Sequence, residues 1–249
     1  MLRLLSPLIV FLLFSLDNSG CDPTQPATAE NTPVSKDTLQ EAYNVALLIM
    51  DGVYNTELTA PYDIFQHTIF RERIKPMRVF TVANTTEVIT TFEGMRILPD
   101  YNYLKDDVPP IDILVVPSAE HHLDTDLEDE IMLEFVHKTA ENAQFVTSHC
   151  DGAFVLAKAG ILDGYASTTF PSDINTYRQM FPQLEVHKDV LFVHDGKFIT
   201  SAGGAKSFEA ALYLCEYLYG KEIAESLAQG LVIDWDLATI PHLVVDSDL

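Results

Sequence analysis

The chain has 249 residues, and 47% of them are hydrophobic, which is enough apolar material to bury a substantial core. It carries 37 acidic against 15 basic side chains, so its formal net charge is -22 at pH 7. Because proteins bind nucleic acids by neutralising phosphates with Lys and Arg, this charge argues against a nucleic-acid partner. The same acidity is typical of a well-solvated surface or of a salty or extracytoplasmic setting, and it names no ligand.

The first 20 residues have the layout of a secretory signal peptide. Arg3 supplies one positive charge, and the run from Leu4 to Leu16 is almost wholly apolar. A membrane-spanning helix needs roughly 20 apolar residues, so this shorter run favours export and cleavage over an ordinary transmembrane anchor. The pattern therefore predicts an exported protein of the periplasm or cell envelope.

Residues 21–43 are predicted to form a flexible tether that precedes a folded domain at 44–249. Ser19-Gly20-Cys21 resembles the end of a bacterial lipobox, in which the cysteine is acylated, although Asn18 stands where that motif usually has an aliphatic residue. A lipid on Cys21 would tether the protein to a membrane. The alternative is a plain secreted protein with a free or disulfide-linked Cys21. The stretch after Cys21 is rich in Pro, Thr, Ala and acidic residues and has nothing to bury.

Beyond the tether, predicted strands alternate with predicted helices. The first strand, Val45–Met50, is a continuous apolar run of the kind buried on both faces of a parallel sheet, so we expect it to be central. The next predicted elements, in chain order, are a helix at 57–70, strands at 77–83, 87–91, 95–98 and 111–116, a helix at 127–139, a strand at 145–147, a helix at 152–159, strands at 190–193 and 197–201, and helices at 208–219 and 222–231. Gly160 is expected to cap the helix before it, and Asp195-Gly196 predicts a hairpin, because these residues accept positive φ. The alternation predicts a single α/β domain, a flavodoxin-like sandwich with a mostly parallel sheet and helices on both faces.

The three cysteines, at positions 21, 150 and 215, are too few and too irregularly spaced for a disulfide framework or a zinc site. Cys215 lies inside an apolar predicted helix and is expected to be a small buried hydrophobe. Cys150 stands between the end of a buried strand and the start of a helix, where unpaired backbone N–H groups and the helix dipole favour a thiolate. The pattern alone allows either a low-pKa nucleophile or an inert buried cysteine.

Glu57 is expected at the carboxyl edge of the sheet, where open α/β sheets bind their ligands, and so is Cys150. Beside a thiolate, the carboxyl group would keep its proton because of like-charge repulsion and desolvation. It could then donate a hydrogen bond or carry a proton. A solvated glutamate at a helix N-terminus is the alternative interpretation.

Three histidines are candidate bases near the same edge. His121 and His122 follow the strand at 111–116, and His149 directly precedes Cys150. Their spacing does not identify which one, if any, is a base. Adjacent histidines also suggest a metal, but no further ligands accompany this pair at a recognisable spacing, so no metal site is predicted.

Six segments of the chain occur together, and in this order, in one protein superfamily. They are Asp51–Pro61, Asp112–Pro117, Ser148–Ala157, Gly160–Gly164, Thr168-Thr169 and Thr200–Gly204. On these segments the chain resembles the ThiJ/PfpI superfamily, of the class I glutamine amidotransferase-like fold, from about Asn44 to Asp236. The segment around Cys150 is most similar to the isonitrile hydratase-like branch.

The resemblance implies a role for particular residues. Cys150 would be the nucleophile on a sharp strand-to-helix turn, the nucleophile elbow, and Glu57 the acidic partner that contacts it. The backbone N–H groups of Ala119 and Asp151 would form an oxyanion-type site, which stabilises negative charge developing on a substrate atom. The resemblance also implies a small-molecule substrate, no cofactor and a homodimer.

The chain departs from the branch at several of these positions. The branch usually has Gly-Gly where this chain has Ser118-Ala119, Asp at position 57 and Thr at position 151. Phe170 stands where many relatives have a histidine, so the Cys-His pair of the family's hydrolases is not carried over and peptidase activity is not expected.

The function that the resemblance implies is a cofactor-independent, cysteine-dependent hydratase or lyase acting on a small electrophile. Conversion of an isonitrile to an N-substituted formamide is the leading hypothesis. A glyoxalase-like or deglycase-like reaction on 2-oxoaldehydes is an alternative within the same chemistry. A non-catalytic domain that senses a ligand or, through oxidation of Cys150, the redox state is an alternative of a different class.

Overall fold

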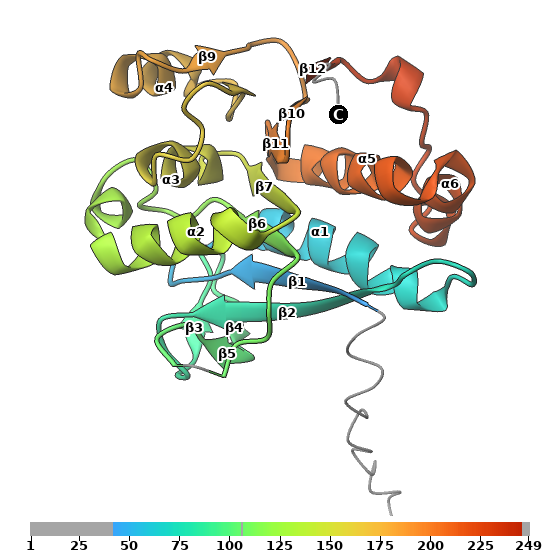
Figure 1. The fold of residues 1–249 in the computed structure, drawn as a ribbon, viewed down its shortest axis with the longest axis horizontal. Helices are drawn as coiled ribbons and strands as arrows, with labels where there is room; N and C mark the ends of the chain where they lie inside the picture. The colour runs from blue at the N-terminus through green and yellow to red at the C-terminus, as the bar shows by residue number, and fades with distance from the viewer. Residues whose placement is uncertain (1–41, 106, 246–249) are drawn as a thin grey trace, which may run out of the picture. The chain divides into compact units, whose positions relative to one another are not determined.

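An eight-stranded sheet in the order β12-β10-β11-β7-β6-β1-β2-β5 organises the part of the chain that the computed structural model describes, residues 42–105 and 107–245 (Figure 1). Its strands are β1 (Tyr43–Leu48), β2 (Met77–Ala83), β5 (Tyr101–Asn102), β6 (Ile113–Val116), β7 (Phe145–His149), β10 (Phe192–Asp195), β11 (Phe198–Ser201) and β12 (His242–Val245). Neighbouring strands are parallel except for the β10–β11 hairpin. The predictions of a mostly parallel sheet and of a central first strand are confirmed, because β1 lies between β6 and β2.

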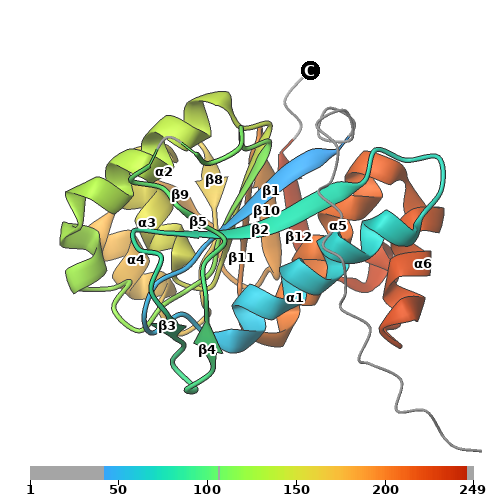
Figure 2. The same ribbon diagram turned by 90° about the horizontal axis from the view of Figure 1, so that it is seen from below.

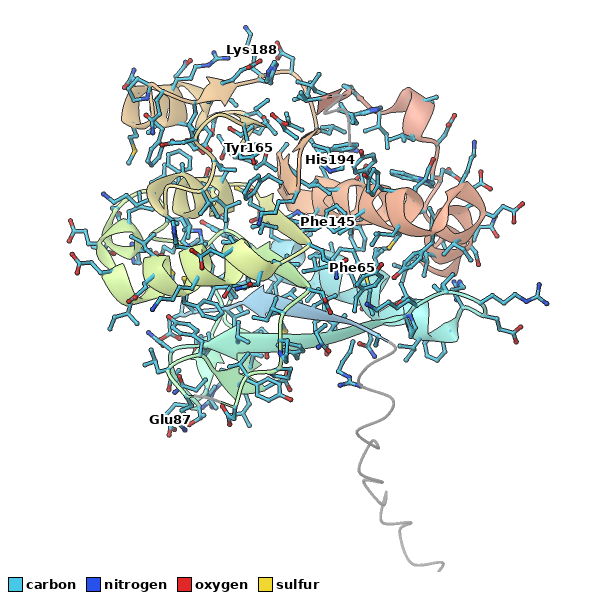
Figure 3. All side chains as sticks on the ribbon, in the orientation of Figure 1. Phe65, Glu87, Phe145, Tyr165, Lys188 and His194 are labelled. Carbon is cyan, nitrogen blue, oxygen red and sulfur yellow. The ribbon has the colours of Figure 1, made fainter. Side chains whose placement is uncertain are left out.

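Helices cover both faces of this sheet (Figure 2). On one face lie α1 (Asn55–Gln66), α5 (Ser207–Tyr219) and α6 (Lys221–Gly230), and on the other lie α2 (Glu130–Asn142), α3 (Gly152–Lys158) and α4 (Ile174–Met180). Successive side chains of a strand point to opposite faces, so Val45 and Leu47 join the first core and Ala46 and Leu48 the second. Both cores are built from buried side chains, among them Phe65 of α1, which packs into the first core (Figure 3).

Some predicted boundaries differ from the observed ones for local reasons. The helix predicted at 127–139 is a 3-10 helix at Thr125–Glu128 followed by α2, because the Asp129 side chain accepts hydrogen bonds from the N–H groups of Ile131 and Met132 and caps a new helix there. The helix predicted at 57–70 ends as α1 at Gln66, and a 3-10 helix continues at His67–Phe70.

The strands predicted at 87–91 and 95–98 are shorter than expected and lie outside the main sheet. They form a two-stranded antiparallel sheet of β3 (Ile89–Thr90) and β4 (Arg96–Ile97), which we call the β3–β4 flap, residues 87–98. This flap lies beside the N-terminal end of α1 (Figure 2). Five further strands and α-helices were not predicted, namely β5, α4, β12, β8 (Ala166–Ser167) and β9 (Glu185–Val186). Most are too short to show a periodic pattern, and β12 exists only because β10 offers it a parallel partner.

The predictions for the signal peptide at 1–20, for Cys21 and for most of the tether at 21–43 lie outside the described residues. Tyr43, the last residue of the predicted tether, is the first residue of β1. Within residues 42–105 and 107–245, none of the helices has the length and apolar character needed to span a membrane.

Candidate active site

Cys150 occupies a strained turn between β7 and α3. Its φ is +53°, a left-handed conformation that is uncommon for a residue with a side chain. Two hydrogen bonds hold the turn: the Cys150 N–H donates to the Ser201 carbonyl at 2.9 Å, and the Thr169 hydroxyl donates to the Cys150 carbonyl at 2.9 Å. Strain of this kind persists only where the surrounding structure enforces it, and it is common at functional sites. The geometry is that of a nucleophile elbow.

Two glycines allow the backbone to approach this elbow. A Cβ added to Gly203, whose φ is +75°, would lie 2.3 Å from the Cys150 Cβ. A Cβ added to Gly152 would lie 2.1 Å from the Val116 carbonyl oxygen, at the point where α3 starts against β6. Both positions therefore require glycine for close packing.

Glu57 lies in the first turn of α1 and reaches the elbow from the neighbouring element. Its side chain is only 5% exposed, so the solvated alternative is wrong. Oε2 accepts a hydrogen bond from the Ser118 N–H at 3.0 Å, and Oε1 accepts one from the Gly204 N–H at 2.9 Å. Burial raises the pKa of Glu57, and the two backbone hydrogen bonds oppose that shift without cancelling it. The carboxyl group can therefore hold a proton at higher pH than an ordinary glutamate.

The Asp151 side chain is a part of the site that sequence reasoning missed. The Cys150 thiol donates to Asp151 Oδ2 at 3.6 Å, and the Thr169 hydroxyl oxygen lies 3.1 Å from Oδ1, so its one proton is shared between Oδ1 and the Cys150 carbonyl. Burial, followed by the charge of Asp173, raises the pKa of Asp151 to about 6. A carboxylate with that pKa can accept and return a proton near neutral pH. Its only signal in the sequence is an acidic residue directly after the cysteine, a position for which only the backbone N–H was assigned a role.

The predicted low-pKa thiolate is not what this environment favours. Burial, and then the charges of Glu57 and Asp151, raise the pKa of Cys150 far above its usual range, while the Asp151 N–H and the Ser118 hydroxyl act in the opposite direction. The dipole of the seven-residue helix α3 is too small to offset desolvation next to two carboxyl groups. Cys150 is therefore held as a thiol, and its reaction requires a base to remove the proton.

The loop after β6 places Ala119 next to the start of α1. Val53 and Ala119 form an antiparallel bridge, in which Tyr54 N–H donates to the Ser118 carbonyl and Glu120 N–H donates to the Gly52 carbonyl, both at 3.0 Å. Within the described part of the chain, the Ala119 N–H donates to no protein oxygen. This leaves it free to bind a substrate atom, and the oxyanion role of Ala119 and Asp151 stays a prediction.

The three histidines are not brought to the thiol. His149 is buried and pairs through Nδ1 with the Ser201 hydroxyl at 2.9 Å, and His122 is buried with Nε2 at 3.3 Å from Met50 Sδ. Burial lowers the pKa of each to about 3, which makes both rings too weakly basic to take a thiol proton. His121 pairs instead with Asp124 at 3.2 Å. In residues 42–105 and 107–245, no cluster of three or more His, Cys, Asp or Glu side chains is placed to hold a metal.

Tyr54, which had no role in the sequence analysis, stands at the rim of the site. It is the N-cap residue of α1, and its ring packs against Phe92 of the β3–β4 flap at a centroid distance of 4.7 Å. Burial, and then the charges of Cys150, Glu120 and Glu57, raise the pKa of Tyr54, so its phenol stays protonated. No spacing pattern in the sequence points to this residue.

Comparison with known proteins gives this arrangement its context. Residues 43–217 match the DJ-1/PfpI family. Isonitrile hydratase of Pseudomonas putida is 29% identical over 186 residues, 74% of this chain and 75% of the relative. The HTH-type transcriptional regulator CdhR of Pseudomonas aeruginosa is 32% identical over 102 residues, 41% of this chain and 30% of the regulator. The crystal structure of Drosophila melanogaster DJ-1beta shares the fold with a TM-score of 0.67 at 22% identity, covering 78% of this chain and all of that one. The chain therefore belongs to the DJ-1/PfpI family.

Proposed function

We propose that this protein is a cofactor-independent, cysteine-dependent hydratase that converts an isonitrile to an N-substituted formamide. The observation that carries the proposal is the Cys150 thiol on its strained elbow, hydrogen-bonded to a carboxylate of pKa about 6 and adjacent to the buried Glu57. Similarity to isonitrile hydratase over three quarters of its length supports the choice of reaction.

The chemistry needs one sulfur nucleophile and two proton carriers. As Cys150 sulfur bonds to the terminal carbon of the isonitrile, the thiol proton passes through Asp151 to that carbon, giving a thioimidate, R–N=CH–S. Glu57 takes a proton from water as the water oxygen bonds to the same carbon, and it passes this proton to the nitrogen, which gives R–NH–CH(OH)–S. The C–S bond then breaks as the hydroxyl proton moves to the sulfur, which releases the formamide R–NH–CHO and restores the thiol. The net reaction consumes one isonitrile and one water.

The first test is formation of a formamide from cyclohexyl isonitrile by the purified protein, followed through the formyl proton by NMR. We expect turnover by the wild type and its loss in Cys150→Ser. The matched control is Cys215→Ser, because Cys215 is a completely buried thiol of α5 that belongs to the apolar core. A wild-type protein that forms no formamide contradicts the proposal.

A second candidate is a sensing domain without turnover. The similarity to the regulator CdhR and the thiol that is only 7% exposed favour it. A sensing domain would form no formamide from isonitriles. It would also form no lactate from methylglyoxal, which is the product expected of the alternative 2-oxoaldehyde reaction. A redox-sensing role further requires that mild peroxide oxidises Cys150 to the sulfenic or sulfinic acid, detectable by mass spectrometry. Export, lipid attachment at Cys21 and homodimer formation stay predictions.

A further inference from the structure

Acidic side chains from separate parts of the chain lie around the elbow and the start of α1. Asp151 Oδ2 accepts from the Cys150 thiol at 3.6 Å, and Glu57 lies buried in the first turn of α1. At the same helix start, Glu93 Oε2 accepts from the Asn55 N–H at 3.0 Å, and the Glu120 N–H donates to the Gly52 carbonyl at 3.0 Å. Asp173 adds its charge beside Asp151. These five side chains come from α1, the elbow, the loop after β6, the β3–β4 flap and the N-cap of α4. Where these carboxyl groups are ionised, the surroundings of the thiol carry negative charge.

Positive side chains are fewer than acidic ones around this region. The β3–β4 flap holds one, the exposed Arg96, against Glu87 and Glu93. Lys206 follows two residues after Gly204, which binds Glu57, but its ammonium pairs with Glu209 at 2.6 Å. His122 and His149 are uncharged at neutral pH because burial lowers the pKa of both. Lys188 lies at the opposite end of the molecule from Glu87 of the β3–β4 flap (Figure 3).

The β3–β4 flap adds an aromatic surface to this negative rim. Three hydrogen bonds fix it beside α1: Phe92 N–H to the Val53 carbonyl at 3.0 Å, Gly52 N–H to the Thr90 carbonyl at 2.9 Å, and Asn55 N–H to Glu93 Oε2 at 3.0 Å. Phe92 remains 51% exposed while it packs on Tyr54. Exposed aromatic faces attract cations and flat apolar groups.

The Ser118 hydroxyl also acts on the sulfur. Ser118 is fully buried, and its uncharged hydroxyl acts to lower the pKa of Cys150. It therefore adds no positive charge that would attract an anion to the site.

We propose that the Cys150 site selects its substrate by charge: it accepts uncharged or cationic electrophiles and rejects anionic ones, with Glu93, Glu120 and the Tyr54–Phe92 pair forming the filter. The inference deepens the proposed function and rests on it only in taking Cys150 as the reacting group. It names the substrate class as a small electrophile whose substituent is apolar, aromatic or ammonium-bearing, and it excludes carboxylates and phosphates.

The test uses three methanethiosulfonates that share one reacting group and differ in charge: the trimethylammonium-ethyl, the methyl and the sulfonatoethyl reagents. In each, the Cys150 sulfur attacks the reagent sulfur, methanesulfinate leaves and a mixed disulfide forms, so no hydratase activity is needed. Rates are read at Cys150 by peptide mapping, because the chain has two other cysteines, and are divided by the rates for N-acetylcysteine methylamide.

We expect the normalised rate of the cationic reagent to exceed that of the anionic one by about tenfold or more at low salt, with the uncharged reagent between them. Glu93→Gln and Glu120→Gln, both at exposed positions, should each lower this ratio. The control Glu222→Gln removes the same charge from an exposed position on α6 and should leave the ratio unchanged. A wild-type ratio near or below one overturns the inference, as does an equal loss of ratio in the control.

The outcome separates this inference from the proposed function. If the protein makes no formamide but shows the charge preference, the charge-selection inference stands and the hydratase proposal fails. If the protein hydrates isonitriles but the reagents modify Cys150 without charge preference, the hydratase proposal stands and the charge-selection inference fails. With an active hydratase, methyl isocyanoacetate should be turned over with a higher kcat/KM than isocyanoacetate, and Glu120→Gln should narrow that difference.

Discussion

The two described cysteines, Cys150 and Cys215, are both buried free thiols, yet their surroundings differ completely. Cys215 is part of the regular helix α5 and contributes to an apolar core, as the sequence predicted. Cys150 has a left-handed backbone, a carboxylate acceptor for its proton and a second carboxyl group nearby. Burial raises the pKa of both thiols. From this comparison we expect any reaction of Cys150 to depend on the proton acceptor beside the sulfur and not on an acidic thiol.

The largest effect is expected from closing the space at the elbow. Gly203→Ala would place a Cβ 2.3 Å from the Cys150 Cβ, so the turn must move, with a loss of about 2 to 4 kcal/mol in the free energy of unfolding and loss of activity. Gly160→Ala is the matched control, since Gly160 also has a positive φ, of +73°, but open space around its Cα. It should cost only about 1 kcal/mol and leave Cys150 as reactive as before. Urea unfolding measures the stability of each variant, and the alkylation rate of Cys150 measures its reactivity. Equal effects from Gly203→Ala and Gly160→Ala would contradict the close packing of Gly203 against Cys150.

Asp151→Asn should change the alkylation rate of Cys150 and the rate of isonitrile hydration in opposite directions. Removing the carboxylate lowers the pKa of Cys150, so alkylation by iodoacetamide at pH 8 should become several-fold faster. Hydration of the isonitrile should slow by roughly 10²- to 10⁴-fold, because the proton acceptor is gone. Neither rate should respond to Cys215→Ser. If Asp151→Asn slowed alkylation and hydration alike, the side chain would be structural and not a proton carrier.

A smaller effect concerns stability against pH. The pKa of Asp151 is raised from 3.8 to about 6 in the folded protein, so between these values the folded state binds more protons than the unfolded state. The contribution of Asp151 to the free energy of unfolding should therefore be largest below about pH 4 and should fall as the pH rises to about 6. The loss is about 2 kcal/mol, and Asp151→Asn should remove it. Urea titrations at pH 4.5 and pH 7 check this, with Glu222→Gln as a control whose pH dependence should match the wild type.

Long apolar runs made the central part of the fold predictable. β1, β2, β6 and β7 were found because strands buried on both faces of a parallel sheet need continuous apolar sequence, and α5 because its length shows a helical period. Two-residue strands such as β5 and β8 carry no such signal. The edge strand β12 depends on its pairing with β10, which only the folded chain supplies.

By itself, the sequence determined the α/β class, the family and the place of Cys150 and Glu57 at one edge of the sheet, because these follow from hydrophobic pattern and from motifs local to the chain. Only the tertiary structure decided which side chains surround the Cys150 thiol. It buried His122 and His149 away from the thiol, turned the Asp151 carboxylate onto it, and brought Tyr54 and Phe92 together at its rim. The physical reason is that desolvation and side-chain orientation depend on neighbours distant in the chain, and these set the pKa values that a local pattern cannot reveal.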